Sequence, residues 1–377
     1  MRAAAGLAIA VAGALLAGCG ASQDTGAPIR RVDTARPSFS EPTVIDNPLF
    51  PVSPGGQTLQ LGTEEGEPLR VEVTTLPRTR TITWDGRRID AVVSQYVAYR
   101  SGRVVEVALD YYAQDDDGGV WYLGEDVDNY ERGVVADHEG SWLAGRDGPG
   151  GLIMPAQPRP GDVFRPENIP DLVFEEVTIQ DAAVTVDGPR GLVDGAVATE
   201  EHLMDGTVEH KVFAPGYGEF RAETSDELVQ VAVAVPADAA AGAVPAVLTQ
   251  LAGGAARVYD DAGAGLAVGA SVDAMTSAWR DRPDDTAPPA LAAALDDALG
   301  RLSGAGDPTA VRQAAVDTAT AVLDLTLPYR PPAEVDGARL DLVARQLAID
   351  TETGDVAGQR SDAVAIAALR DRGAATR

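Results

Sequence analysis

The pattern of apolar residues changes near Pro236, and this change limits the folds open to the chain. Before it, short runs of Val, Tyr, Phe and Trp alternate with polar residues, as in β-strands with one buried face. After it, aromatic residues become rare, and Ala and Leu recur at intervals of three and four, as on one face of a helix. We therefore predict a β domain over 47–235 and an α-helical domain over 236–377.

The β domain is expected to be mostly antiparallel. Its apolar runs are short, and Gly, Asp, Asn and Pro separate them at intervals of about ten residues. Such spacing is typical of a β sandwich or a partly open barrel. The clearest predicted strands are LRVEVTTL, IDAVVSQYVAYR, VVEVALDYYA, GVWYLGE and the hairpin HKVFAPGYGEFRAE.

The second part is predicted to form an antiparallel helical bundle. Pro288-Pro289, Asp307-Pro308 and Pro331-Pro332 are typical helix starts, because proline fits the first turn and Asp caps it. Connections of a few residues make neighbouring helices antiparallel. The predicted helices cover about 245–261, 270–281, 288–303, 308–326, 332–350 and 355–371.

The first residues are typical of an export signal. Arg2 precedes an apolar run that ends in small residues. Leu16-Ala17-Gly18-Cys19 resembles the lipobox of bacterial lipoproteins, which implies cleavage of the signal peptide 1–18 and acylation of Cys19. Residues 19–46 lack apolar periodicity and are predicted to be a flexible linker. The resemblance implies an exported protein held on the outer face of the cytoplasmic membrane.

Charge and cysteine content exclude several functions. Asp and Glu total 58 against 30 Lys and Arg, so the net charge is −28 and nucleic acid is not an expected partner. Lys211 is the only lysine, and the Ala- and Gly-rich composition is typical of GC-rich coding, as in actinobacteria. Cys19 is the only cysteine, so no intrachain disulfide and no thiolate metal site can form. No cofactor is predicted.

The acidic stretch DYYAQDDDGGVWYLGEDVDNYE, residues 110–131, is the first candidate site. Its carboxylates do not match a calcium-binding EF-hand loop, because Gly119 stands where the fifth position needs a ligand. An extended segment over 120–124 separates the acidic groups by about 16 Å. A hairpin turn is the main interpretation. Calcium at Asp115, Asp116 and Asp117, or a sugar stacked on Tyr112, Trp121 or Tyr122, stays open as an alternative.

The histidines give a second candidate. His202 and His210 flank Asp205-Gly206, a typical two-residue hairpin turn. That turn would pair His202 with Glu209 and Glu200 with Lys211. The two histidines would then lie on opposite faces of the hairpin, which argues against a shared metal ion. Enzyme signatures are missing: the sequence has no Gly-x-Ser-x-Gly, His-Glu-x-x-His, phosphate-binding or dinucleotide motif.

Several segments in order resemble a family of uncharacterised secreted and lipoprotein β domains. They are NPLFPVSPG, DYYAQDDDGGVWYLGED, EGSWLAG, GLIMPAQPRPGDVFRPE and VEHKVFAPGYGEF, within 47–225. The resemblance implies a fold but no activity, so no catalytic residue is carried over. This chain departs from the family pattern at Tyr111, Gly119 and the residue after Arg165.

Together these observations predict a membrane-tethered envelope protein that binds a ligand or partner without catalysis. Its expected partners are the bilayer, through acylated Cys19, and an unidentified envelope molecule. Two alternatives remain open. One is an exported hydrolase that acts on cell-wall glycan through a carboxylate pair, which 58 acidic residues leave unassigned. The other is a structural interaction module that works through its helices.

Overall fold

A computed structural model describes residues 28–283 and 286–373. In this part of the chain, fifteen strands form one sheet and are followed by helices. The strand order is β1-β10-β11-β12-β13-β14-β15-β2-β3-β4-β5-β6-β7, with β8 and β9 paired to β6. All pairs except β1–β10 are antiparallel between named strands. The predicted antiparallel β fold is therefore confirmed.

The strands vary widely in length. The longest ones, β3, β4, β11 and β12, form the walls of the curved sheet. The bounds are β1 Arg30–Arg31, β2 Gln57–Glu64, β3 Glu67–Trp84, β4 Arg87–Arg100, β5 Arg103–Gln114, β6 Val120–Glu131, β7 Val134–Asp137, β8 Trp142–Leu143, β9 Gly151–Met154, β10 Asp162–Ile169, β11 Val173–Gly188, β12 Gly191–Leu203, β13 Val208–Ala214, β14 Gly218–Glu223 and β15 Glu227–Val235.

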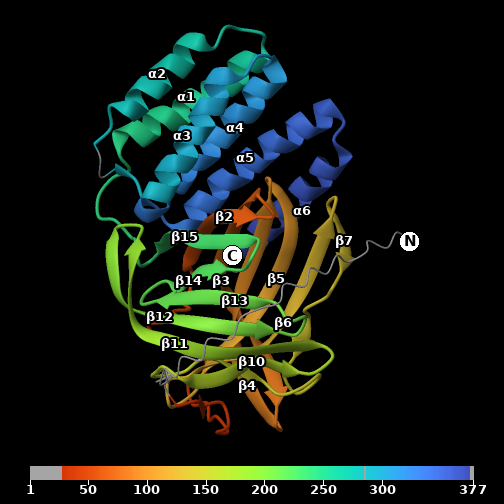
Figure 1. The fold of residues 1–377 in the computed structure, drawn as a ribbon. Coiled ribbons are helices and arrows are strands. Elements are labelled where there is room, and N and C mark those ends of the chain that lie inside the picture. The colour runs from red at the N-terminus through yellow and green to blue at the C-terminus, as the bar shows by residue number, and fades with distance from the viewer. Residues whose placement is uncertain (1–27, 284–285, 374–377) are drawn as a thin grey trace, which may run out of the picture.

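The sheet curls into a partly open barrel (Figure 1). Strand β9 pairs with β6 and also passes close to β10, where a Cβ atom on Gly151 would lie 1.9 Å from the carbonyl oxygen of Pro166. Only glycine permits that approach. The sheet is not closed, so of the two predicted architectures the open barrel is confirmed and the sandwich is not. Its concave side is called the inner face below.

Six helices follow β15 in the described residues, and their bounds match the predicted ranges within three residues. Asp307 caps α4 by accepting hydrogen bonds from the backbone N–H groups of Thr309 and Ala310, both at 3.0 Å. The helices are α1 Ala246–Gly263, α2 Gly269–Arg280, α3 Pro289–Gly304, α4 Pro308–Asp324, α5 Pro332–Thr353 and α6 Val356–Gly373. Whether the two parts fold as separate domains stays a prediction.

The helices cover the outer face of one wall of the sheet (Figure 1). One apolar cluster joins Leu59 of β2 and Val233 of β15 to Leu248, Leu251 and other buried residues of the helices. None of the described helices is long and apolar enough to cross a membrane.

A buried group of charges also joins the helices to the sheet; we call it the interface network. It contains Arg70, Glu72, Asp324, Asp336, Arg339 and Arg372. Arg70 contacts Asp324 at 2.6 Å and Glu72 at 2.7 Å. Arg372, from α6, contacts Glu72 at 3.0 Å and Asp336 at 3.1 Å. Three cations thus face three carboxylates.

Burial alone would raise the pKa of Glu72. The charges of Arg339, Arg70 and Arg372 outweigh that effect and hold the pKa well below its usual range. Glu72 is therefore ionised under all ordinary conditions, and the network is electrically balanced.

Candidate functional site: an acidic cavity inside the curved sheet

A cavity of about 370 Å³ lies inside the curved sheet. Its wall is built from strands around the whole curve, including β2–β5 and β11–β15, and residues 50–52 contribute apolar side chains to it. Apolar and aromatic surface predominates. The polar and charged side chains in the lining are Ser53, Gln57, Thr58, Gln60, Thr75, Ser94, Tyr96, Asp110, Tyr112, Glu175, Glu201, Lys211, Tyr217 and Glu219.

Lys211 lies at the centre of a group that we call the lysine cluster. Its ammonium nitrogen Nζ lies 3.0 Å from Glu201 and 3.3 Å from Glu209. Glu219 and Glu175 follow at 3.5 and 3.8 Å. One cation thus contacts four carboxylates, which lie on β11, β12, β13 and β14. Oxygen atoms of Glu175, Glu201 and Glu209 lie within 4.8 Å of one another, close enough to hold a metal ion.

Burial shifts the ionisation of this cluster. It raises the pKa of Glu201 to about 8, with repulsion from Glu175 adding to the effect and Lys211 opposing it. The pKa of Glu209 is raised for the same primary reason. Burial alone would lower the pKa of Lys211, but its carboxylate neighbours raise it well above the usual value. Lys211 therefore stays charged, while the carboxylates compete for it.

The hairpin between β12 and β13 places this cluster on the inner face, and here the predicted register is wrong. The loop has three residues: Leu203 N–H donates to Thr207 O, and Gly206 takes a positive φ of 92°. Glu201 consequently pairs with Glu209 and Thr199 with Lys211. A slip of one residue exchanges the two faces of a strand.

The same slip corrects the prediction for the histidines. Glu200 pairs with His210 and His202 with Val208, so both histidines lie on the same, exposed face of the hairpin. His202 contacts Glu200 at 3.1 Å. The argument against a shared metal ion that rested on opposite faces therefore fails.

The opposite wall of the cavity presents a second group, which we call the Asp110 row. Thr75, Ser94 and Asp110 are direct cross-strand neighbours on β3, β4 and β5. Asp110 accepts a 2.8 Å hydrogen bond from the hydroxyl of Tyr122. No Lys, Arg or His of the described residues pairs with Asp110. Burial raises its pKa to about 7, and the charge of Glu219 adds to this.

The hydroxyl groups in this row are available to a ligand. Ser94 is 3% exposed and Thr75 is 7% exposed, and both line the cavity. Neither hydroxyl has a hydrogen-bond partner within residues 28–283 and 286–373. Because both side chains open onto the cavity, water or an added molecule inside it can hydrogen-bond to them.

A pair of carboxylates extends the acidic inner face beyond the cavity. Glu125 lies directly opposite Asp110 on β6 and shares a hydrogen bond with Glu167 of β10. Such a bond requires a proton, and burial with the charge of Asp110 raises the pKa of Glu125 far enough to hold it. Trp142 donates to Glu167 at 3.0 Å.

The predicted sugar-binding residues divide between cavity and core. Tyr112 lines the cavity, with its ring 4.9 Å from Phe50 and 5.0 Å from the stacked ring of Tyr122. Trp121 is 5% exposed and packs against Trp84, as expected for a core side chain. Sequence reasoning thus identified one residue of the cavity but neither the Asp110 row nor the lysine cluster.

The predicted calcium residues lie at the tip of the β5–β6 hairpin, as the turn interpretation requires. Asp115 accepts hydrogen bonds from Trp121 Nε1 at 2.7 Å and from the backbone of Gly119 at 2.8 Å. Asp116 accepts from Ser38 and from the backbone of Ser40, both at 2.7 Å. Asp117 lies beside them in the exposed turn. Protein donors already occupy two of the three carboxylates; calcium binding here stays a prediction.

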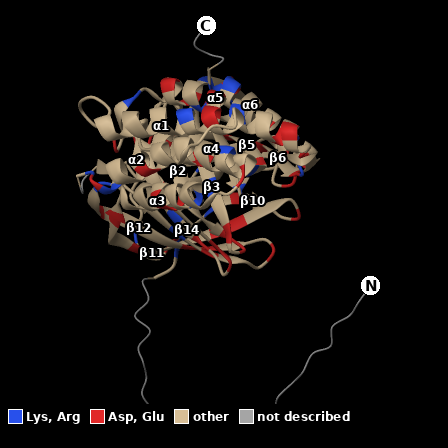
Figure 2. Cartoon of the chain, turned by 90° about the horizontal axis from the view of Figure 1, so that it is seen from above, with Lys and Arg blue, Asp and Glu red and all other residues tan. Residues whose placement is uncertain are grey.

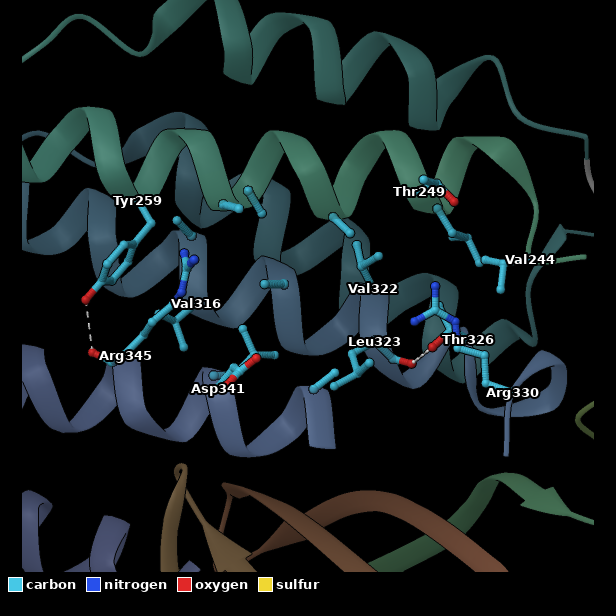
Figure 3. Close-up of a pocket in the computed structure, with 18 residues that line it drawn as sticks. Val244, Thr249, Tyr259, Val316, Val322, Leu323, Thr326, Arg330, Asp341 and Arg345 are labelled. Atoms are coloured by element: carbon cyan, nitrogen blue, oxygen red, sulfur yellow. Dashed lines mark hydrogen bonds between the residues drawn. The ribbon is translucent and has the colours of Figure 1, made fainter. Parts of the chain in front are cut away.

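A second cavity, of about 260 Å³, lies between α1, α4 and α5 (Figure 3). Small apolar side chains line most of it. The Tyr259 hydroxyl at one end donates to the carbonyl of Arg345 at 3.2 Å, and Thr326 at the other end donates to that of Leu323 at 2.7 Å. The other polar side chains in this lining include Thr249, Arg330 and Asp341, which are exposed, so the helical cavity differs from the one inside the sheet, whose free polar side chains are buried.

Acidic residues outside the cavity are spread widely. In the view of Figure 2, Asp and Glu occur on helices and strands alike. The acidic residues in this view are therefore not confined to the strands that line the cavity.

No protein-family model and no curated protein matches the chain. A solved structure of a candidate lipoprotein from Parabacteroides distasonis aligns with a TM-score of 0.27 and 12% identity, over 49% of this chain and 97% of that chain. A likeness at this level carries no argument about fold or function. Cys19 lies outside the described residues, so its acylation stays a prediction.

Proposed function

We propose that the protein is a lipid-anchored binding protein of the cell envelope that takes a small ligand into the cavity of its curved sheet. The anchor rests on the lipobox-like sequence at Cys19. Two or more acyl chains on one residue hold a protein at a membrane far more firmly than one. Binding rests on the cavity and requires no catalytic residue.

One observation carries the binding proposal: free polar groups converge on a cavity of suitable size. Small-molecule sites are typically concave, mostly apolar and furnished with a few placed polar groups. The cavity of about 370 Å³ has aromatic walls and the unpaired hydroxyls of Thr75 and Ser94 next to Asp110.

The alternatives have less support. Of the large apolar side chains described in the helical part, Leu266 and Val356 are exposed, and they lie outside or at the end of a helix rather than on a continuous patch. A docking surface would need such a patch. A glycosidase needs two carboxylates free to act on a substrate, whereas Glu175, Glu201 and Glu209 share Lys211, and Glu125 shares a hydrogen bond with Glu167.

Thermal unfolding with a chemically mixed panel of sugars, amino acids, organic cations and organic anions tests the binding proposal. The variant Ser94→Leu fills the cavity at one wall, and Ser303→Leu makes the same replacement on the exposed surface of α3. We expect at least one compound to raise the melting temperature of the wild type and of Ser303→Leu, but not of Ser94→Leu. Near-ultraviolet circular dichroism confirms that each variant is folded. A panel that stabilises none of the three proteins contradicts the proposal.

Cell fractionation tests the anchor. The variant Cys19→Ala should move from the membrane fraction to the soluble fraction, while a Ser22→Ala variant in the neighbouring linker should stay with the membrane. Membrane association that survives Cys19→Ala would show that acylation is not the anchor.

A further inference from the structure

The charge balance of the cavity singles out one class of ligand. Its lining contains the carboxylates of Asp110, Glu175, Glu201 and Glu219 but a single basic side chain, Lys211. The lysine cluster already uses that ammonium group, at 3.0–3.8 Å from four carboxylates. Asp110, on the other wall, has no basic partner in the described part of the chain. An added molecule that enters the cavity therefore meets an uncompensated negative charge.

The side chains beside Asp110 fit a donor of several hydrogen bonds. Ser94 lies directly opposite Asp110 and is only 3% exposed. Its unpaired hydroxyl lines the cavity. Thr75 continues the row on the next strand with a second unpaired hydroxyl. An ammonium group carries three N–H donors and no acceptor. A carboxylate and two hydroxyl oxygens in a row are therefore suitable acceptors for it.

The aromatic walls favour an organic cation over a metal ion. Tyr96 and Tyr112 line the cavity on the strands that carry Ser94 and Asp110, and Phe50 packs against Tyr112 with ring centroids 4.9 Å apart. A cation near an aromatic face is attracted by the ring, and a hydrocarbon part gains from burial beside it. A calcium ion instead needs six to eight oxygen ligands.

Lys211 itself shows that this inner face accepts an alkylammonium group. The three carboxylates that could hold a metal ion, Glu175, Glu201 and Glu209, surround its Nζ. Its side chain carries the ammonium group on four carbons, as a primary amine with a short carbon chain does.

We infer that the cavity binds a small organic ammonium ion, with its ammonium group against Asp110, Ser94 and Thr75 and its carbon part against Tyr112 and Phe50. This inference rests on the proposed binding function and adds the chemical class of the ligand. A neutral molecule of the same shape leaves Asp110 uncompensated and binds more weakly.

Isothermal titration at pH 8 with the mature protein tests the inference. The probes are phenethylammonium, 1,4-diaminobutane and choline, with 2-phenylethanol as the neutral counterpart of the first. We expect at least one amine to bind at least about tenfold more tightly than the alcohol. Asp110→Asn should weaken amine binding by about thirtyfold or more, as for loss of one partner of a buried charge pair. Asp117→Asn, at the exposed hairpin tip, removes the same charge and should leave affinity unchanged.

The outcomes separate this inference from the proposed function. If no amine binds, or if the alcohol and the amine bind alike and Asp110→Asn changes neither, the ammonium inference is overturned. The binding proposal then still stands when another compound of the mixed panel stabilises the wild type but not Ser94→Leu. Calcium chloride that binds in the cavity more tightly than every amine, with the same loss in Asp110→Asn, would also overturn it by assigning the row to a metal ion.

Discussion

Two groups of buried charges lie on opposite faces of the curved sheet and differ in the balance of their signs. On the outer face, the interface network sets three arginines against three carboxylates. On the inner face, the lysine cluster sets one ammonium group against four carboxylates, and Asp110 stands without a basic partner. Each group contains buried carboxylates, Glu72 and Asp324 on the outer face and Glu201 and Asp110 on the inner face, so burial alone does not explain the difference between them.

The ratio of positive to negative charges in each group determines how the pKa values of its carboxyl groups shift. Surrounding arginines lower the pKa of Glu72, although burial opposes them. Burial and neighbouring carboxylates raise the pKa of Glu201 to about 8 and that of Asp110 to about 7. A neutral network can be fully ionised and serve to fix the helices on the sheet. An acidic inner face with one ammonium group keeps its buried carboxylates partly protonated, and an added cation would favour their ionised form.

Breaking the balanced network should have the largest effect. Glu72→Gln leaves Arg70, Arg339 and Arg372 facing only two carboxylates, and removal of one partner from a buried ionic group costs about 3–5 kcal/mol. We expect that loss in the free energy of unfolding, measured by urea denaturation at pH 7. Glu65→Gln, in the exposed turn before β3, is the control and should change stability by less than about 0.5 kcal/mol. Equal effects of the two substitutions would mean that the network does not join helices to sheet.

Removal of the single cation on the inner face should have a smaller effect that depends on pH. Lys211→Met keeps the apolar stem and leaves four carboxylates without a cation. At pH 8 we expect a loss of roughly 2–4 kcal/mol in the free energy of unfolding. At pH 5, protons can replace the lysine, because burial already raises the pKa values of Glu201 and Glu209. Denaturation at both pH values measures the difference.

The comparison fails if Lys211→Met lowers the free energy of unfolding by the same amount at pH 5 as at pH 8. Such a result would mean that the carboxylates of the lysine cluster cannot exchange their cation for protons. The interface network supplies the matched reference. Glu72→Gln should lower the free energy of unfolding by nearly the same amount at pH 5 and at pH 8, because the pKa of Glu72 lies below both.

Local signals in the sequence predicted the fold well. The helix starts at Asp307-Pro308 and Pro331-Pro332 match α4 and α5, since capping depends on the few residues around each start. The predicted strands IDAVVSQYVAYR and VVEVALDYYA lie within β4 and β5, since alternation depends only on neighbouring residues. An open barrel was one of two predicted architectures, because periodicity does not fix how far a sheet curls.

The candidate site could not be predicted in the same way. Its position depends on a one-residue difference in the loop after Leu203, which places Glu201 on the same face of the hairpin as Glu209 and Lys211. Asp110 and Lys211 are 101 positions apart, and nothing local indicates that they line one cavity. The interface network joins Arg70 to Arg372 through Glu72, which again depends on tertiary structure.

The smallest expected effect is a gain in stability from Asp110→Asn, and it sharpens the comparison further. Tyr122 donates a hydrogen bond to Asp110, and the charge of Glu219 raises the pKa of Asp110. The charge of Asp110 in turn raises the pKa values of three further carboxyl groups, those of Glu106, Glu125 and Glu167. Because the pKa of Asp110 is about 7 in the folded protein and near 4 when unfolded, the folded state holds the extra proton between these values. Stability therefore falls as pH rises through that window and changes no further above it.

Asparagine carries no charge, so the variant escapes this loss. The free energy of unfolding of Asp110→Asn should equal that of the wild type near pH 4 and exceed it increasingly up to about pH 7, where the difference levels off. Urea denaturation at steps of one pH unit measures it, and Asp117→Asn should follow the wild type throughout. A destabilised Asp110→Asn at pH 8 would place the carboxylate among groups that hold the fold. A stabilised variant that also loses amine affinity would instead show that the protein keeps a costly charge on its inner face because the ligand requires it.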